Sequence, residues 1–366
     1  MSDVPLPERL RRRIERDGPL RFDDFQQAAL YERAGGYYER EGRVGREGDF
    51  VTGASWHPAF ARCLARVASR LAPEIRPPLD FVDVGAGEGE LLGFLSGARP
   101  DHLEVRLAGV EASEVRRAAA LARVPDARFF ASVEELPHGL AGLVVAYELL
   151  DALPVRALRV RDDGTLLERR VGLDGEGDFA WVEAPCPDGP KLLARLERRG
   201  AALEPGQLLE VRPGAAGLAR AIAARLSRGL LLLFDYGAPT RALYGPAHVN
   251  GTLEAFHGHR VTRDVLGEPG SRDITSWVDF GEVAEALGDE GLTVHGLVSQ
   301  SRFLLASGIA GELVPPKDGD DSPERAVERN AVAKLVMPGG MGESIRVLVA
   351  ERDTGLGKSL ISSPLV

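Results

Sequence analysis

The stretch Leu79-Asp80-Phe81-Val82-Asp83-Val84-Gly85-Ala86-Gly87-Glu88-Gly89 decides the fold of this chain. Its first six residues form a mainly apolar run of the kind that makes a buried strand, and glycines follow at alternate positions. Leucines then recur at helical spacing, at Leu91, Leu92 and Leu95. The pattern predicts a strand, a tight loop and a helix. Because glycine has no Cβ, the loop backbone can approach a ligand closely, so we expect a nucleotide site, with a structural turn as the alternative.

The spacing of the glycines distinguishes between two cofactors. The dinucleotide-binding fingerprint places its third glycine at the position of Glu90 in this chain. The loop therefore favours S-adenosylmethionine (SAM) over NAD. Glu111 ends the next predicted strand, where a carboxylate can accept hydrogen bonds from both ribose hydroxyls, as it would with either cofactor. Its alternative role is to cap a helix.

Cofactor contacts are expected at Gly85, Gly87 and Gly89 of the loop itself and at the neighbouring strand ends. Asp83 is expected to hold the loop or the methionine end of the cofactor, or else to bond a neighbouring amide. Ser132, Val133 and Glu134 follow a predicted strand and are expected to flank the adenine, although Glu134 also suits the start of a helix.

Short strands alternate with helices along the central part of the chain. Apolar runs predict further strands at 107–111, 143–147 and 229–235, and Ser113 is a suitable N-cap for an alanine-rich helix over 114–123. This alternation is typical of an α/β fold with a mostly parallel, doubly wound sheet.

Other segments depart from that alternation and set the expected domain boundaries. Residues 1–75 are expected to form an N-terminal helical segment and a cofactor-covering loop, and 76–350 the main domain, followed by a tail over 351–366. Turn signals such as Asp162-Asp163-Gly164 predict an antiparallel meander within an insertion at 155–205. Two further insertions are expected, a lid or acceptor loop at 237–275 and a helical segment at 302–335.

Composition restricts the partners. A net charge of −10 over 366 residues argues against nucleic acid and anionic membranes, and no apolar stretch reaches the roughly 20 residues of a membrane span. Two isolated cysteines make neither a disulfide framework nor a metal site, so we expect no metal. No signal peptide is recognised, so we expect a cytoplasmic protein. A homodimer is an open alternative for its oligomeric state.

Several motifs in order carry a resemblance to a known family. They include Asp83–Gly89, Glu148-Leu149-Leu150-Asp151-Ala152-Leu153-Pro154-Val155, Gly48-Asp49-Phe50-Val51-Thr52, Asp235-Tyr236-Gly237, Gly251-Thr252-Leu253, His259-Arg260, Asp273-Ile274-Thr275, Val278-Asp279-Phe280 and Met341-Gly342-Glu343. Through nearly its whole length the chain resembles the MidA-like SAM-dependent methyltransferases, which include the mitochondrial protein-arginine methyltransferase needed for complex I assembly.

The resemblance implies a class I, Rossmann-like methyltransferase sheet of seven strands with a reversed final strand, and methylation of a protein arginine. Glu148 and Asp151 would then grip the acceptor guanidinium and accept its proton. His259, in the segment expected to cover the site, is a further catalytic candidate, with a solvated loop histidine as the alternative. Asp49 and Phe50 are expected to close over the methionine moiety, although a tight turn explains them equally well.

Two departures from the family pattern lie near the expected chemistry. The family commonly has Asn where this chain has Tyr147, and a Pro-Glu pair where it has Ala54-Ser55. They leave a second hypothesis open, an assembly or interaction protein that keeps the SAM fold without transferring methyl. An NAD-linked oxidoreductase is a third.

Overall fold

A computed structural model describes residues 4–39, 57–258, 260–313, 323–337 and 339–361 of the chain. The chain divides into two compact units. The first unit comprises Met1–Phe50, Leu150–Gly217 and Gly237–Val283, and the second comprises Val51–Leu149, Leu218–Tyr236 and Ala284–Val366.

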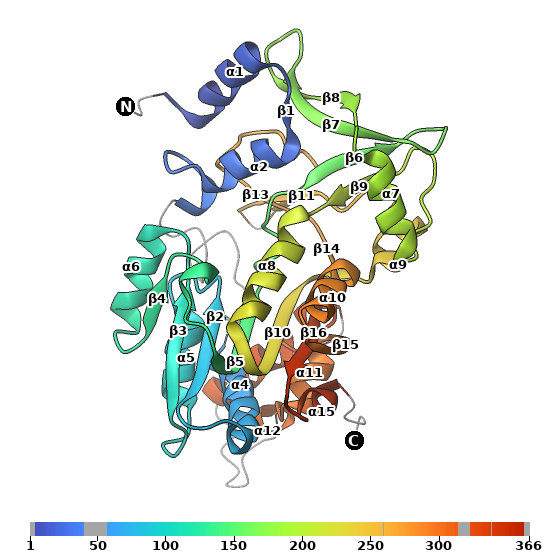
Figure 1. The fold of residues 1–366 in the computed structure, drawn as a ribbon. Coiled ribbons are helices and arrows are strands. Elements are labelled where there is room, and N and C mark those ends of the chain that lie inside the picture. The colour runs from blue at the N-terminus through green and yellow to red at the C-terminus, as the bar shows by residue number, and fades with distance from the viewer. Residues whose placement is uncertain (1–3, 40–56, 259, 314–322, 338, 362–366) are drawn as a thin grey trace. The chain divides into compact units, whose positions relative to one another are not determined.

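The second unit is built on a twisted sheet whose strand order is β15-β16-β10-β5-β2-β3-β4. Its strands are β2 (Leu79–Val84), β3 (Val105–Val110), β4 (Arg128–Phe130), β5 (Leu140–Tyr147), β10 (Leu226–Ala238), β15 (Thr293–Ser299) and β16 (Ile345–Arg352). β4, β3, β2, β5 and β10 run parallel, and β16 is antiparallel to both of its neighbours (Figure 1). This confirms the mostly parallel sheet and its reversed final strand. The short β14 (Val278–Asp279) extends the sheet by pairing with the end of β10.

Several helices share a buried core with one face of this sheet. The helices of the second unit are α4 (Pro58–Leu71), α5 (Glu90–Ala98), α6 (Glu114–Arg123), α11 (Gln300–Ala306), α12 (Ala310–Leu313), α13 (Pro323–Lys334), α14 (Met341–Ser344) and α15 (Gly357–Ile361), with 3-10 turns at Ala72–Glu74 and Val133–Glu135. Phe60 and Leu64 of α4 pack into one core with Phe81, Leu143 and Phe234 from three strands. Alternate strand residues reach this core because side chains of a strand point to opposite faces in turn.

The first unit has a sheet of its own, in the order β1-β7-β6-β9 with β8 paired to β7. Its elements are α1 (Leu6–Asp17), β1 (Leu20–Arg21), α2 (Phe22–Tyr31), a 3-10 turn (Tyr37–Glu39), β6 (Arg156–Val160), β7 (Leu166–Leu173), β8 (Phe179–Pro185), α7 (Gly189–Arg198), β9 (Leu208–Val211), α9 (Thr240–Leu243) and a second 3-10 turn (Pro246–His248). Ala157 of β6 packs into a core with Phe25 of α2, whereas the adjacent Leu158 packs with Leu192 of α7. The sheet is thus covered on both faces.

The predicted meander forms as β6, β7 and β8, but these strands pair in the sheet of the first unit and not with the parallel strands. Alternation predicts that a strand forms without specifying its partner. The segment 237–275 shows no periodicity, yet it holds the small sheet of β11 (Glu254–His257), β12 (Arg260–Thr262) and β13 (Asp273–Thr275). Strands of three or four residues are too short to display a repeat. α8 (Pro213–Arg225) and α10 (Phe280–Asp289) complete the fold.

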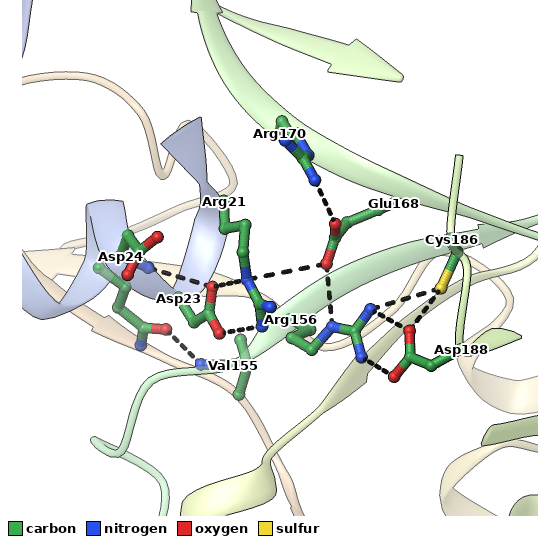
Figure 2. A network of polar contacts seen from close by, with 10 residues as sticks. Arg21, Asp23, Asp24, Val155, Arg156, Glu168, Arg170, Cys186 and Asp188 are labelled. Carbon is green, nitrogen blue, oxygen red and sulfur yellow. Dashed lines mark hydrogen bonds and ion pairs between the residues drawn. The ribbon is translucent and has the colours of Figure 1, made fainter. Parts of the chain in front are cut away.

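A polar network fastens β6 to its neighbours in the first unit (Figure 2). The buried guanidinium of Arg156 donates to Glu168 Oε1 at 2.9 Å and to both oxygens of Asp188, at 2.6 and 2.9 Å. The bonds from Arg156 to Asp188 lower the pKa of Asp188 to about 2. Within the described ranges, no helix is long and apolar enough to cross a membrane.

Candidate functional site

The predicted cofactor residues that the structure describes lie at or after the carboxyl ends of parallel strands in the second unit. Val84 at the end of β2 is in register with Val110 of β3 and Ala146 of β5, and Val110 is in register with Phe130 of β4. The loops that follow these four strands therefore start from one edge of the sheet. Open α/β sheets bind their ligands at this edge.

The glycine loop turns in left-handed conformations. Gly85, Gly87 and Gly89 have φ values of 85°, 55° and 79°, which disfavour any residue with a Cβ. Neighbours also approach closely, because a Cβ on Gly85 would lie 2.9 Å from Cδ1 of Leu149. Gly89 caps α5, so the loop leads directly into a helix N-terminus, which attracts negative charge.

Glu111 is tied to the glycine loop through its side chain. Its Oε2 accepts a hydrogen bond from the Gly87 amide and its Oε1 accepts one from the Ser113 amide, each at 2.9 Å. The side chain is buried. A carboxylate has four lone-pair sites, so each oxygen can still accept a second bond from a hydroxyl. Glu111 thus fixes the loop and keeps acceptor capacity for a ribose.

Asp83 is a buried acid at the end of β2. Its burial, together with the nearby charges of Glu111 and Glu90, raises its pKa to about 7. Such a group ionises readily once a cation, such as an amino group, comes close.

The third part of the predicted cofactor site follows β4. Val133 is buried, and Ser132 precedes the 3-10 turn that begins there. Glu134 is exposed, and hydrogen bonds from its own amide and from Ser132 lower its pKa. The Glu111 amide donates to the Phe130 carbonyl at 3.0 Å, which ties the end of β4 to the position of Glu111.

The segment after β5 begins with a strained residue. Glu148 has a φ of 47°, in the left-handed region that residues other than glycine rarely adopt, and its amide donates to the Phe234 carbonyl at 2.8 Å. Such strain occurs often at functional sites. The next residue, Leu149, is the one that packs against Gly85. Glu148 therefore adjoins a residue that touches the glycine loop.

Tyr147 points away from this chemistry. Its ring packs against Phe60 and Phe234 in the core, and its hydroxyl donates to Gln300 Oε1 at 2.7 Å. Gln300 Nε2 donates in turn to the Leu335 carbonyl at 3.1 Å. Burial is the main reason that the pKa of Tyr147 lies well above its usual value.

Asp151 lies in the first unit, where Thr275 holds it. The Thr275 hydroxyl donates to Asp151 Oδ2 at 2.9 Å, and Asp151 is buried. The motifs Glu148–Val155 and Asp273–Thr275, far apart in the sequence, thus meet at this carboxylate. The same motif contributes Asp273, whose Oδ1 accepts a bond from the Tyr38 hydroxyl at 2.9 Å.

Three predicted site residues, Asp49, Phe50 and His259, lie outside the described residues, as do Ala54 and Ser55. In the part of the chain that the structure describes, no group of three or more His, Cys, Asp or Glu side chains is arranged to hold a metal ion.

Sequence reasoning missed several residues around these motifs. Thr275 lies within a recognised motif, and its role could have been suspected from its place beside a predicted carboxylate. Arg212 contacts the segment of Asp151 through buried hydrogen bonds, and Gln300 meets Tyr147 from 153 positions along the chain. No local pattern marks either of them.

Comparison with known proteins fits this arrangement. Residues 59–298 match a family described as "Putative S-adenosyl-L-methionine-dependent methyltransferase". A crystal structure of a protein from Burkholderia thailandensis bound to S-adenosyl-homocysteine is 30% identical, with a TM-score of 0.87 over 98% of this chain and 95% of that one.

Curated relatives extend the match. The protein arginine methyltransferase NDUFAF7, mitochondrial, of Mus musculus is 26% identical over 93% of this chain and 83% of its own length. The homologue in Drosophila melanogaster is 27% identical over 82% of this chain and 74% of its own length. Both are named as mitochondrial proteins, so the expected cytoplasmic location is wrong. That expectation rested on missing targeting features, which do not specify a compartment.

Proposed function

This chain belongs to the family of S-adenosyl-L-methionine-dependent methyltransferases that its residues 59–298 match, and we propose that its acceptor is an arginine side chain of a protein. SAM is its methyl donor, and methyl transfer is its reaction. The names of the curated relatives, which are protein arginine methyltransferases, support the proposed acceptor.

We propose that the cofactor lies along the carboxyl edge of the sheet in the second unit. Glu111 would accept the ribose hydroxyls while it holds the Gly87 amide. The glycine loop would lie along the methionine portion, and Asp83 would face the positive amino group. Ser132, Val133 and Glu134 would flank the adenine. Asp49 and Phe50 remain proposed contacts of the methionine end.

One observation carries the proposed acceptor site: Glu148, a strained residue, directly precedes Leu149, which packs against Gly85 of the loop. Only Leu149 and Leu150 separate Glu148 from Asp151 in the chain, so two carboxylates follow the strand that borders the donor loop. Carboxylates match the planar guanidinium, which presents five N–H donors. The segment 237–275, with His259, is proposed to cover the acceptor.

The chemistry needs little beyond positioning and charge. A guanidinium nitrogen attacks the methyl carbon in line with the carbon–sulfur bond, that bond breaks, and its electron pair leaves with the sulfur as neutral S-adenosyl-homocysteine. The new N–C bond makes the attacking nitrogen give up a proton. Glu148 or Asp151 would accept it after orienting the guanidinium.

The test uses the full chain with tritium-labelled SAM and a degenerate peptide pool that has arginine at one fixed position. We expect label in the arginine pool and methylarginine in its mass spectrum. A matched pool with lysine in place of arginine is the control. Label in the lysine pool alone, or S-adenosyl-homocysteine binding without label in either pool, would contradict arginine as the acceptor.

A further inference from the structure

Arg212 is a buried arginine that follows β9 and is absent from the sequence motifs considered above. Its Nε donates to the Leu153 carbonyl at 2.9 Å, and its Nη1 donates to the Trp277 carbonyl at 3.1 Å. Its Nη2 donates to the carbonyls of Asp151 and Ser276, both at 2.8 Å, and to the Ser276 hydroxyl at 2.6 Å. One guanidinium therefore joins two segments that are distant in sequence.

Both segments lead to the same carboxylate. The first contains Asp151 itself, and the second begins at Thr275, whose hydroxyl donates to Asp151 Oδ2. Arg212 fixes the backbone of Asp151, and it fixes the backbone next to Thr275. Thr275 then sets the rotation of the Asp151 side chain. A shift of either segment would break or lengthen the bond between Thr275 and Asp151.

Arg212 also belongs to a wider network within the first unit. Burial raises the pKa of Glu210, while hydrogen bonds from the amide and hydroxyl of Thr252 and the charge of Arg212 act to lower it. Thr252 Oγ1 also accepts a bond from the Trp277 amide at 3.0 Å. A buried cation is costly unless its donors and its charge are matched, and Glu210 supplies negative charge close by.

We propose that Arg212 is a positioning residue for methyl transfer, one that holds Asp151 at the angle and depth the acceptor requires. The inference rests on the proposed function, in which Asp151 contacts the acceptor. In this proposal Arg212 acts through Asp151 and not directly on the donor or the acceptor. Its planar fork serves several carbonyls at fixed directions, which the single ammonium of a lysine cannot do.

Arg212→Lys is the first variant to test, because it keeps the positive charge and the aliphatic stem. We expect transfer to the arginine peptide pool to fall by about 10- to 100-fold in kcat, the range that a misplacement of about 1 Å can cause. S-adenosyl-homocysteine affinity, measured by calorimetry, should stay within about twofold of the parent chain, because the proposed cofactor residues are untouched.

Arg156→Lys is the matched control. Arg156 is similarly buried in the same unit and donates four hydrogen bonds against the five of Arg212, but its bonds hold β6 to Glu168, Cys186 and Asp188 (Figure 2). Both variants are assayed at a temperature at which melting curves show them folded. Arg156→Lys should then keep the parental kcat. If Arg212→Lys loses no more kcat than Arg156→Lys, Arg212 is only structural and the proposal is wrong.

A cycle with Asp151→Asn tests whether Arg212 acts through Asp151. In that background Arg212→Lys should cost less than about twofold further, because the group it positions has already been removed. A full 10- to 100-fold further loss would overturn the proposal. Should Arg212→Lys not fold, Thr275→Val tests the same idea, and an unchanged kcat would count against it. Failure of the parent chain to label the arginine pool would instead refute the acceptor assignment.

Discussion

The amide of Gly87 donates a hydrogen bond to Glu111 Oε2 at 2.9 Å, so the residue proposed to bind the ribose also holds the loop proposed to bind the methionine portion. Removing this carboxylate should therefore damage the cofactor site twice. We expect Glu111→Ala to weaken S-adenosyl-homocysteine binding by at least about 100-fold, since hydrogen bonds to a charged group contribute about 1.5–3 kcal/mol each. Calorimetry measures the affinity. Glu111→Gln keeps one acceptor oxygen, so its affinity should lie between those of the parent and of Glu111→Ala.

Asp126→Asn is the control for this experiment. Asp126 is an exposed acid in the turn before β4, so its neutralisation changes the net charge equally without touching the loop. It should bind S-adenosyl-homocysteine as the parent chain does. Equal affinities for Glu111→Ala and the parent would show that Glu111 has no role in the cofactor site.

The raised pKa of Asp83 leads us to expect that cofactor binding depends on pH. Its carboxyl has a pKa of about 7 and is proposed to face the positive amino group, so the ionised form should bind best. We expect affinity to rise several-fold, measured by calorimetry from about pH 5.5 to about pH 7.5. Asp83→Asn should bind more weakly than the parent at the upper pH and show little slope. A parental slope in Asp83→Asn would assign the titration to another group.

The folding stability of the cofactor-free chain should fall as pH rises, whereas the cofactor affinity should rise. The pKa of Asp83 is raised above its ordinary value of 3.8, so the folded state binds more protons than the unfolded state between that value and about 7. Asp83 therefore makes the chain less stable as pH rises through this window. The unfolding free energy of Asp83→Asn minus that of the parent, measured in urea, should be larger at pH 7.5 than at pH 5.5. The same difference at both pH values would contradict a buried, protonated carboxyl.

The second unit could be predicted far better than the first, for a physical reason. The glycine loop, its strand and the helix after it are local, so periodicity and the lack of a Cβ specify them together. Arg212 lies 61 positions from Asp151, and only the folded chain brings them together. The strands β6, β7 and β8 were expected from their turns, but β1, which pairs with β7, comes from the N-terminal segment.

Tyr147 is a departure from the family pattern whose side chain packs in the core. From sequence it stands one residue before Glu148 and suggests an altered acceptor face. Its hydroxyl instead meets Gln300 in the core. We expect Tyr147→Phe to keep the parental transfer rate while costing about 1–2 kcal/mol of unfolding free energy, because Gln300 Oε1 loses its buried donor. Rate assays and urea unfolding measure the two effects.

Tyr147→Asn restores the residue common in the family and gives the contrasting result. The smaller side chain would leave a cavity beside Phe60 and Phe234, and we expect a loss of about 3–5 kcal/mol, as for other large-to-small core changes. A gain in transfer rate with unchanged stability would show that the core contacts do not govern this position.

Glu148 allows the backbone and the carboxylate to be tested separately. Its φ of 47° is strained for any residue with a Cβ, so Glu148→Gly should relieve the strain that Glu148→Ala retains. We expect the glycine variant to be about 1 kcal/mol more stable than the alanine variant in urea unfolding, against the usual preference for alanine. Both variants should bind S-adenosyl-homocysteine as the parent does and lose most transfer to the arginine pool, because each lacks the carboxylate.

The two variants share the loss of the carboxylate and differ in backbone strain. A transfer rate that recovered in the glycine variant alone would therefore show that strain, and not the carboxylate, limits the reaction. An alanine variant with the parental rate would remove Glu148 from the acceptor site altogether.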